Sequence, residues 1–302
     1  MKIHAPFLLM ALVNNIIEAT TYPAGITNCG IASWYDKAPK RAVTMNQGTT
    51  EIMLALGLVD SMVGTAYLDD EILPEIASDY SKVPVLSSGY PDIDTLMGTN
   101  PDFLYASYRS AFQASTKEGD KRIDYFDVLN GCNLTVSESK GNSTYCRPEL
   151  HDKNIKTYLQ APSCELNVHR PDEVTLNTLY EEIWDIALIF DAFPKAQSLV
   201  STIEGHFTKA TNLVEMHGSR SNKVKVFWLD MWSDETPFVG ACCGSVNTII
   251  EYAGAENIFN EKGIEEKKTW DKVTWNEVVQ KDPDVIIIVD ASWDAAGKLY
   301  VL

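Results

Sequence analysis

Residues 41–66 read RAVTMNQGTTEIMLALGLVDSMVGTA, and this stretch decides the fold class. The short apolar segments 41–45 and 61–66 have the length and composition of buried strands. Between them, residues 48–58 begin with a polar Gly-Thr-Thr-Glu run and continue with apolar residues at helical spacing. Because a helix is the usual connection between parallel strands, the stretch predicts an α/β fold with a parallel sheet.

The same alternation of strands and helices continues along the chain. Residues 83–86 and 103–108 are further strand candidates, and residues 92–100 form a short helical pattern that ends before Pro101. Residues 194–217 then carry an apolar stripe at helical spacing over 24 residues, which corresponds to about 36 Å of helix. We therefore expect a stiff helical connection rather than a flexible linker.

A short segment that leads into a strand occurs twice, once in each half of the chain. Residues 99–105 read TNPDFLY and residues 281–287 read KDPDVII, and each segment follows a short helical pattern and enters an apolar strand. The alternative is coincidence between generic βαβ units. The repeat predicts two similar lobes, with an N-terminal lobe at 25–172, connecting helices at 173–218 and a C-terminal lobe at 223–302.

Composition excludes several classes of protein. The 302 residues are 45% hydrophobic and 22% charged, as in an ordinary globular protein. The formal net charge is −17, whereas a nucleic-acid binder or an anionic-lipid binder needs a basic surface. We therefore expect no nucleic-acid partner.

The N-terminus predicts export from the cell. Residues 1–19 carry a lysine at position 2, continue with a short apolar run and end at small residues, which is the pattern of a secretory signal peptide. The apolar run is shorter than the ~20 residues that a membrane span needs. A buried N-terminal helix is the alternative. We expect a secreted or cell-surface protein, which would be periplasmic in a bacterium.

Six cysteines fit an oxidising compartment, because an even number after a signal peptide favours disulfides. Cys132 and Cys146 bracket a polar stretch at about 130–146 that holds glycosylation sequons at Asn133 and Asn142. This arrangement predicts a disulfide-closed, glycosylated surface loop. Two cysteines are adjacent and could form either a disulfide or two buried thiols. They are Cys242 and Cys243.

Motifs for enzymatic chemistry are missing from the sequence, whereas a pattern for ligand binding is present. The chain contains no GxSxG, P-loop, GxGxxG or HExxH motif, and its five histidines are scattered, so we expect no enzyme, metal site or cofactor. Aromatic residues follow four strand candidates, at the edge where open α/β sheets bind ligands. They are Tyr67, Tyr108, Trp232 and Trp293. With Arg109 as a polar anchor, they predict a cleft for a bulky, partly apolar molecule.

Longer runs resemble a known family. Residues 41–70, 89–109, 240–259 and 274–294 resemble class III periplasmic substrate-binding proteins, which serve ABC importers for iron–siderophores, haem and cobalamin. The resemblance covers nearly the whole chain after residue 25. It implies two Rossmann-like lobes, a long rigid interlobe helix and a shallow cleft. The runs ITNCG and YLQAPSC are similar to one branch of the family, which implies a disulfide between Cys29 and Cys164.

The resemblance also implies a function. The leading hypothesis is capture of a ferric siderophore for iron uptake, and the alternative is a cobalamin, haem or deazaflavin-precursor binder. Less favoured alternatives are a secreted enzyme and an adhesion protein without a ligand. The expected cleft residues are Asn46, Gln47, Tyr67, Tyr108, Arg109, Trp232, Phe238 and Trp293.

A membrane transporter or receptor is the expected partner. In the family each lobe presents a Glu eight residues before the Asp of the Pro-Asp pair. Here these positions hold Asp94, which keeps the charge, and Asn276, which does not, although Glu277 is adjacent. Family members also continue with another strand and a terminal helix, so we expect a truncated C-terminal lobe.

Overall fold

A computed structural model describes residues 19–112, 146–216 and 223–290. Most of the expected signal peptide at 1–19 lies outside these ranges, as do Cys132, Asn133, Asn142 and Trp293. Within the described residues, no helix has both the length and the apolar character needed to cross a membrane.

The first sheet is parallel, as the sequence predicts. Among the described residues it has five strands in the order β5-β4-β3-β6-β7. The strands are β3 (Ala42–Met45), β4 (Met62–Ala66), β5 (Val85–Ser87), β6 (Phe103–Ala106) and β7 (Lys156–Leu159). Every residue of β3 and β6 is buried, because helices and loops cover both faces of a central parallel strand.

Short helices connect these strands. The α-helices are α1 (Gln47–Ala55), α2 (Ala77–Tyr80), α3 (Ile93–Gly98) and α5 (Arg147–Asp152). Single 3₁₀ turns are η1 (Val59–Ser61), η2 (Arg109–Phe112), η3 (Ala161–Ser163) and η4 (Asn167–His169). The helix expected at 92–100 is α3, and its N-cap Asp92 accepts a hydrogen bond from the Thr95 N–H.

An antiparallel hairpin precedes the first sheet and was not predicted. Its strands are β1 (Ala24–Asn28) and β2 (Ile31–Tyr35). A disulfide between Cys29 and Cys164 ties the turn of the hairpin to the segment after β7. The pairing that the family resemblance implies is therefore present. Gly30 follows with a φ of +81°, and a side chain there would collide with the His169 ring.

The second sheet mixes parallel and antiparallel pairs. In the described part of the chain, β8 pairs with β10 and β12 in parallel, and β9 pairs antiparallel with β8 and β11. The strands are β8 (Lys225–Met231), β9 (Phe238–Gly240), β10 (Glu256–Asn257), β11 (Trp270–Lys272) and β12 (Val285–Ile288). Two helices pack with them, α8 (Ser245–Tyr252) and α9 (Trp275–Lys281).

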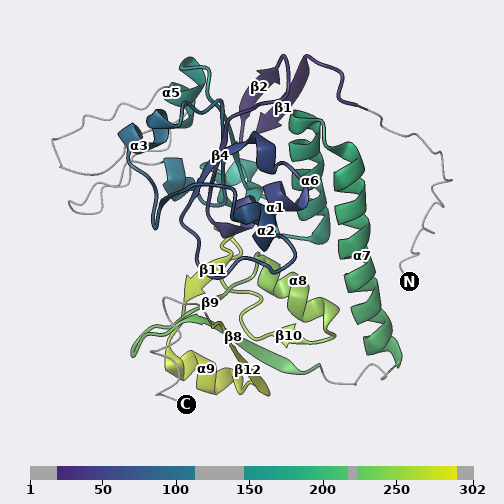
Figure 1. The fold of residues 1–302 in the computed structure, drawn as a ribbon. Coiled ribbons are helices and arrows are strands. Elements are labelled where there is room, and N and C mark those ends of the chain that lie inside the picture. Colours follow the sequence, from purple (N-terminus) through teal and green to yellow (C-terminus); the bar gives the residue numbers. More distant parts are fainter. Residues whose placement is uncertain (1–18, 113–145, 217–222, 291–302) are drawn as a thin grey trace.

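Two long helices lie between the sheets in the sequence. They are α6 (Leu176–Phe190) and α7 (Phe193–Met216), and Asp191 in the left-handed conformation ends α6. Figure 1 shows α7 running past both sheets along one side of the molecule. Its far end contacts α8, where the rings of Phe207 and Tyr252 lie 4.7 Å apart between centroids. A single helix is therefore present where the sequence predicts one at 194–217.

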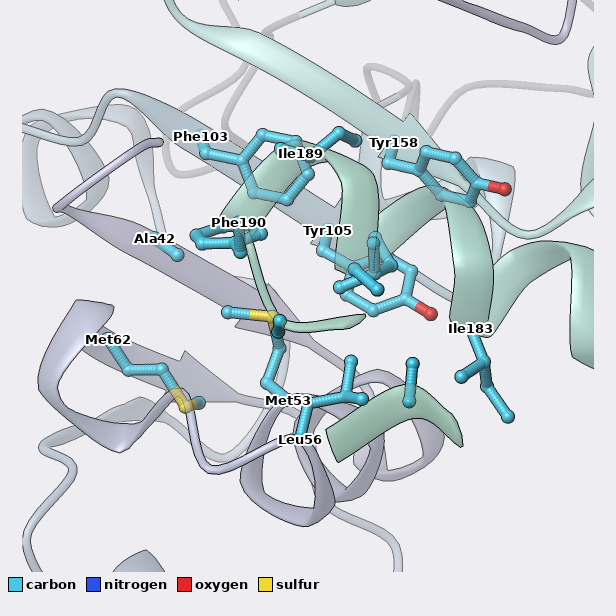
Figure 2. Close-up of a cluster of buried hydrophobic side chains, with 14 of the residues drawn as sticks. Ala42, Met53, Leu56, Met62, Phe103, Tyr105, Tyr158, Ile183, Ile189 and Phe190 are labelled. Atoms are coloured by element: carbon cyan, nitrogen blue, oxygen red, sulfur yellow. The ribbon is translucent and has the colours of Figure 1, made fainter. Parts of the chain in front are cut away.

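The core of the first sheet includes α6, although the sequence places this helix in the connection (Figure 2). Ile183, Ile186 and Ile189 are fully buried on the face of α6 that packs against the sheet. The Phe190 ring contacts the Phe103 ring edge to face at 5.1 Å. Helix α6 therefore packs into the same hydrophobic core as the first sheet.

A carboxyl group is buried where α6 meets β6. Glu182 Oε1 accepts a hydrogen bond from the Tyr105 hydroxyl and another from Gln160 Nε2 at 2.8 Å. Burial raises the pKa of Glu182 to about 7, against an ordinary value of 4.5. Close by, the Tyr158 hydroxyl donates to Asp185 at 2.8 Å. Glu182 therefore retains a proton in the folded protein at a pH where the unfolded chain has lost it.

This shift makes stability depend on pH. Between pH 4.5 and 7 the folded state binds the Glu182 proton more tightly, so the free energy of unfolding falls by about 3 kcal/mol as the pH rises through this window. Glu182→Gln should remove this loss and be more stable than the parent at pH 8. Urea unfolding at pH 5 and pH 8 measures the effect. The matched control Glu181→Gln, at an exposed neighbour, should keep the parental slope, and an equal slope in Glu182→Gln would contradict the assignment.

Candidate ligand-binding cleft

A cleft of about 1120 Å³ lies where the carboxyl ends of strands from both sheets meet. Asn46, Tyr67 and Tyr108 follow β3, β4 and β6, and Asp230 comes from the end of β8. The volume suffices for a ligand of several hundred Å³. The lining residues are Asn46, Tyr67, Leu68, Asp69, Ser88, Tyr90, Tyr108, Arg109, Ser110, Pro162, Ser163, Arg170, Asp230, Met231, Phe238, Lys267, Lys268, Thr269, Trp270 and Val289.

The expected cleft residues fall into three groups: those that line the cleft, those that make other contacts, and one outside the described residues. Those that line the cleft are Asn46, Tyr67, Tyr108, Arg109 and Phe238. Gln47 instead donates from Nε2 to Glu51 and to the Glu71 carbonyl, and Trp232 lies against Trp275 with ring centroids 4.6 Å apart. Trp293 lies outside the described residues.

Two cleft residues have unusual backbone conformations. Asn46 has a φ of +81° and Tyr67 a φ of +57°, and positive φ is uncommon for residues other than glycine. Backbone hydrogen bonds hold both residues, from the Asn46 N–H to Ala66 O and from the Tyr67 N–H to Ser87 O. Each residue ends a strand and turns the chain at the cleft. Backbone strain of this kind concentrates at ligand sites.

Three tyrosines form one aromatic wall of the cleft. Tyr67 and Tyr90 meet edge to face at 4.7 Å, and the Tyr90 hydroxyl bonds Ser110 at 2.9 Å and Asn46 at 3.2 Å. Desolvation, followed by the charges of Asp69 and Asp230, raises the pKa of Tyr108 to about 12. Tyr90 was not predicted. It follows the strand candidate at 83–86, so the pattern of aromatic residues after strands also applies to it.

A second stretch of the cleft wall is basic and was not predicted. Arg170 Nε donates to Cys164 O at 2.6 Å, and Lys267 Nζ donates to Arg170 O at 2.9 Å. Lys267 also forms an ion pair with Asp172 at 2.8 Å, and Lys268 lies next to it in the cleft wall. These residues lie in loops without a periodic pattern, so the sequence offered no signal for them.

A buried ion pair supports the loop at 160–170, which carries part of this wall. Arg147 is fully buried, and its Nη1 lies 3.3 Å from Glu165 Oε2. Its Nη2 donates to Asn28 Oδ1 at 2.7 Å, so the same guanidinium also holds the hairpin. Together with the disulfide from Cys29, this pair fixes the loop from two sides.

The described residues offer no ready-made metal site. No group of three or more His, Cys, Asp or Glu side chains among them could hold a metal ion. His151 lies beside Thr157 instead of in the cleft, and desolvation lowers its pKa to about 4. An aromatic cleft with polar groups suits a bulky ligand that brings its own donor atoms.

Two α/β units with a cleft at their strand ends define a ligand-binding protein. Residues 43–299 match the family model described as periplasmic binding protein. The match covers most of the chain, and the chain therefore belongs to the periplasmic binding protein family, which binds ligands and is not a family of enzymes. No curated protein matches the chain significantly.

Solved structures show the same fold. A periplasmic binding protein from Veillonella parvula is 26% identical, with a TM-score of 0.68 over 88% of this chain and 76% of that one. The "ABC-type Fe3+-hydroxamate transport system" structure from Saccharomonospora viridis is 19% identical, with a TM-score of 0.64 over 89% and 80%. The periplasmic haem-binding protein of Vibrio cholerae is 16% identical, with a TM-score of 0.51 over 82% and 75%.

The Arg147–Glu165 pair allows a test of how the cleft loop is supported. Arg147→Met leaves the Glu165 carboxylate buried without its partner and should lower the free energy of unfolding by about 3–5 kcal/mol. The double variant Arg147→Met/Glu165→Met should recover part of the loss. Urea unfolding measures both, with Lys153→Met, at an exposed lysine nearby, as the control. A loss below about 1 kcal/mol in the single variant would contradict this account.

Proposed function

We propose that the protein captures a ferric siderophore in the cleft for iron uptake. The observation that carries this proposal is the aromatic wall formed by Tyr67, Tyr90 and Tyr108 at the strand ends of a wide cleft. The described residues supply no three-ligand metal group, whereas a siderophore surrounds iron with its own donors. Aromatic faces then contact the organic shell of the chelate.

Haem binding is the main alternative, and the cleft supports it less. Structures similar to this chain include an ABC-type Fe3+-hydroxamate transport system and a periplasmic haem-binding protein. Haem iron takes an axial His, Tyr, Cys or Met from the protein. In the described part of the cleft no histidine is present, so an axial ligand would have to come from a tyrosine or from Met231. Cobalamin and a deazaflavin precursor remain alternatives of the same kind.

The two units act as lobes in this proposal. The N-terminal lobe at 25–172 and the C-terminal lobe at 223–302 would be held by the helices at 173–218, with α7 as a rigid strut. Capture would take place at the cell surface or in the periplasm, and a membrane transporter would receive the ligand. Support comes from the continuity of α7 over 24 residues and from its contact with α8.

Of the expected docking residues, Asp94 is the best placed. Asp94 is exposed in the first turn of α3, and Asn276 is exposed in the first turn of α9 but carries no charge. Glu277 is already engaged, because it completes a capping box with Thr274 and forms a 3.0 Å ion pair with Lys262. These contacts, led by the Thr274 N–H, lower the pKa of Glu277 to about 2. Docking would therefore rest on Asp94.

Ligand capture can be tested by tryptophan fluorescence, since Trp270 lines the cleft. A ferric siderophore such as ferrichrome should quench it saturably at micromolar concentration, and Tyr67→Ala/Tyr108→Ala should weaken binding about tenfold by removing two ring contacts. Trp34→Ala, at a ring that is 65% exposed on the hairpin, serves as the control. The proposal fails if no ferric chelate binds, and tight binding of haem instead would favour the haem alternative.

Docking can be separated from ligand binding. Asp94→Lys should leave chelate affinity unchanged but lower the uptake of radiolabelled ferric chelate by native cells about tenfold, because like charges meet at a basic transporter surface. Asp79→Lys, on α2, is the matched control. Parental uptake in the Asp94 variant would exclude this docking role.

A further inference from the structure

The basic wall of the cleft contrasts with the rest of the molecule. We define it as Arg170, Lys267 and Lys268, three cations of the cleft lining. The whole chain carries a formal charge of −17, so a cluster of three cations in the cleft lining is unexpected. The lining also holds two carboxylates, Asp69 and Asp230, whose charges raise the pKa of Tyr108.

The basic wall is one continuous structure built from both halves of the chain. Arg170 comes from the segment after β7, and its Nε and Nη2 donate to the carbonyls of Cys164 and Glu165. Lys267 crosses from the second unit and donates to Arg170 O at 2.9 Å. A guanidinium carries five N–H donors, so Arg170 keeps donors for a ligand after these two bonds.

The disulfide between Cys242 and Cys243 positions the lysines of the wall. The Cys242 N–H donates to Lys262 O at 3.0 Å, and the Cys243 N–H donates to Lys268 O at 3.3 Å. The Cys243 carbonyl accepts from the Val174 N–H at 2.9 Å, in the segment that leads to α6. The cysteine pair therefore connects the lysine segment to the segment that enters the first core.

The existing ion pairs leave the wall able to bind an anion. Lys267 pairs with Asp172, but the Asp172 side chain is 95% exposed, so solvent weakens this pair. Lys268 lies 3.4 Å from Asp271, a loose contact for an ion pair. A ligand anion inside the cleft is better shielded from water than Asp172, and its attraction to the lysines is correspondingly stronger.

We propose that the basic wall is a subsite for a carboxylate of the captured ligand, so that the protein takes anionic ferric chelates in preference to neutral ones. This inference rests on the proposed function, because it assigns the ligand class of the same cleft. Carboxylates suit the wall, since one guanidinium and two ammonium groups give charge-assisted hydrogen bonds. The tyrosine wall contacts the apolar part of the same ligand.

A pair of ferric chelates tests the charge preference. The parent should bind ferric citrate, which is anionic, more tightly than ferrichrome, which is neutral. Lys267→Gln/Lys268→Gln should weaken ferric citrate at least about tenfold, about 1.4 kcal/mol, and leave ferrichrome within about twofold. The charge-conserving Lys267→Arg/Lys268→Arg should retain the preference. Lys223→Gln/Lys272→Gln, at two exposed lysines outside the cleft lining, controls for net charge because it also removes two positive charges.

The outcomes separate the subsite from the proposed function. Equal weakening of both chelates, or of neither, overturns the carboxylate subsite while siderophore capture stands. If neither ferric chelate binds, siderophore capture fails. In that case the binding of iron-free citrate tests the subsite. Binding by the parent that Lys267→Gln/Lys268→Gln weakens supports the subsite, and the absence of such binding overturns the subsite as well.

A cysteine variant tests the positioning role with the same readout. Cys242→Ser/Cys243→Ser should reduce the preference for ferric citrate over ferrichrome, because the lysine segment loses its fixed turn, while circular dichroism checks that the variant folds. Reduction of the parent by a dithiol should act in the same direction, and the same treatment of the Cys242→Ser/Cys243→Ser variant isolates the part that comes from the Cys29–Cys164 disulfide. The dithiol gives two electrons and two protons, the bond between the two sulfurs breaks to two thiols, and the reductant closes its own disulfide. An unchanged preference in both experiments excludes the positioning role.

Discussion

The packing of α6 into the first core is the constraint on which the rest of the structure depends. Three isoleucines and Phe190 bury one face of this helix against β6, so its direction is fixed along its whole length. The left-handed Asp191 then turns the chain, and α7 begins at a defined angle and place. Helix α7 contacts α8 through Phe207 and Tyr252. Hydrogen bonds from Val174 to Cys243 and from Lys267 to Arg170 also join the second unit to the first half of the chain, so several contacts together set the position of the cleft walls.

Sequence reasoning recovered the elements with a strong hydrophobic period and missed the others. Strands β3, β4, β6 and β12 and the helices α1, α3, α6 and α7 follow predicted segments, although Val285 and Ile286 of β12 are exposed. The β1–β2 hairpin was missed because polar residues interrupt its short strands, and its position depends on a disulfide to Cys164. Strands β9, β10 and β11 have two or three residues each, which is too short for any period to show.

The candidate site was recovered where it depends on topology and missed where it depends on tertiary contacts. Aromatic residues after strands must lie near the carboxyl edge of a sheet, and this rule placed Tyr67 and Tyr108 in the cleft lining. The rule does not say which way a ring turns, and Trp232 turns to Trp275 instead. The basic wall depends on loops held by the buried Arg147–Glu165 pair and by two disulfides, whose effect on loop position no local pattern reveals.

An acidic protein can bind an anion because charges act over short distances. At physiological salt the Debye length is about 8 Å, so most of the −17 charge lies too far from the cleft to act there. Inside the cleft, the potential depends on the lining residues, and the half-buried Lys267 and Lys268 are screened less than charges on the outer surface. The acidic exterior then contributes mainly to solubility, and recognition depends on how a few cations are held. Selection of a ligand by charge is thus a property of the loops at 160–172 and 262–270, while the sheets provide the frame that brings the two loops together.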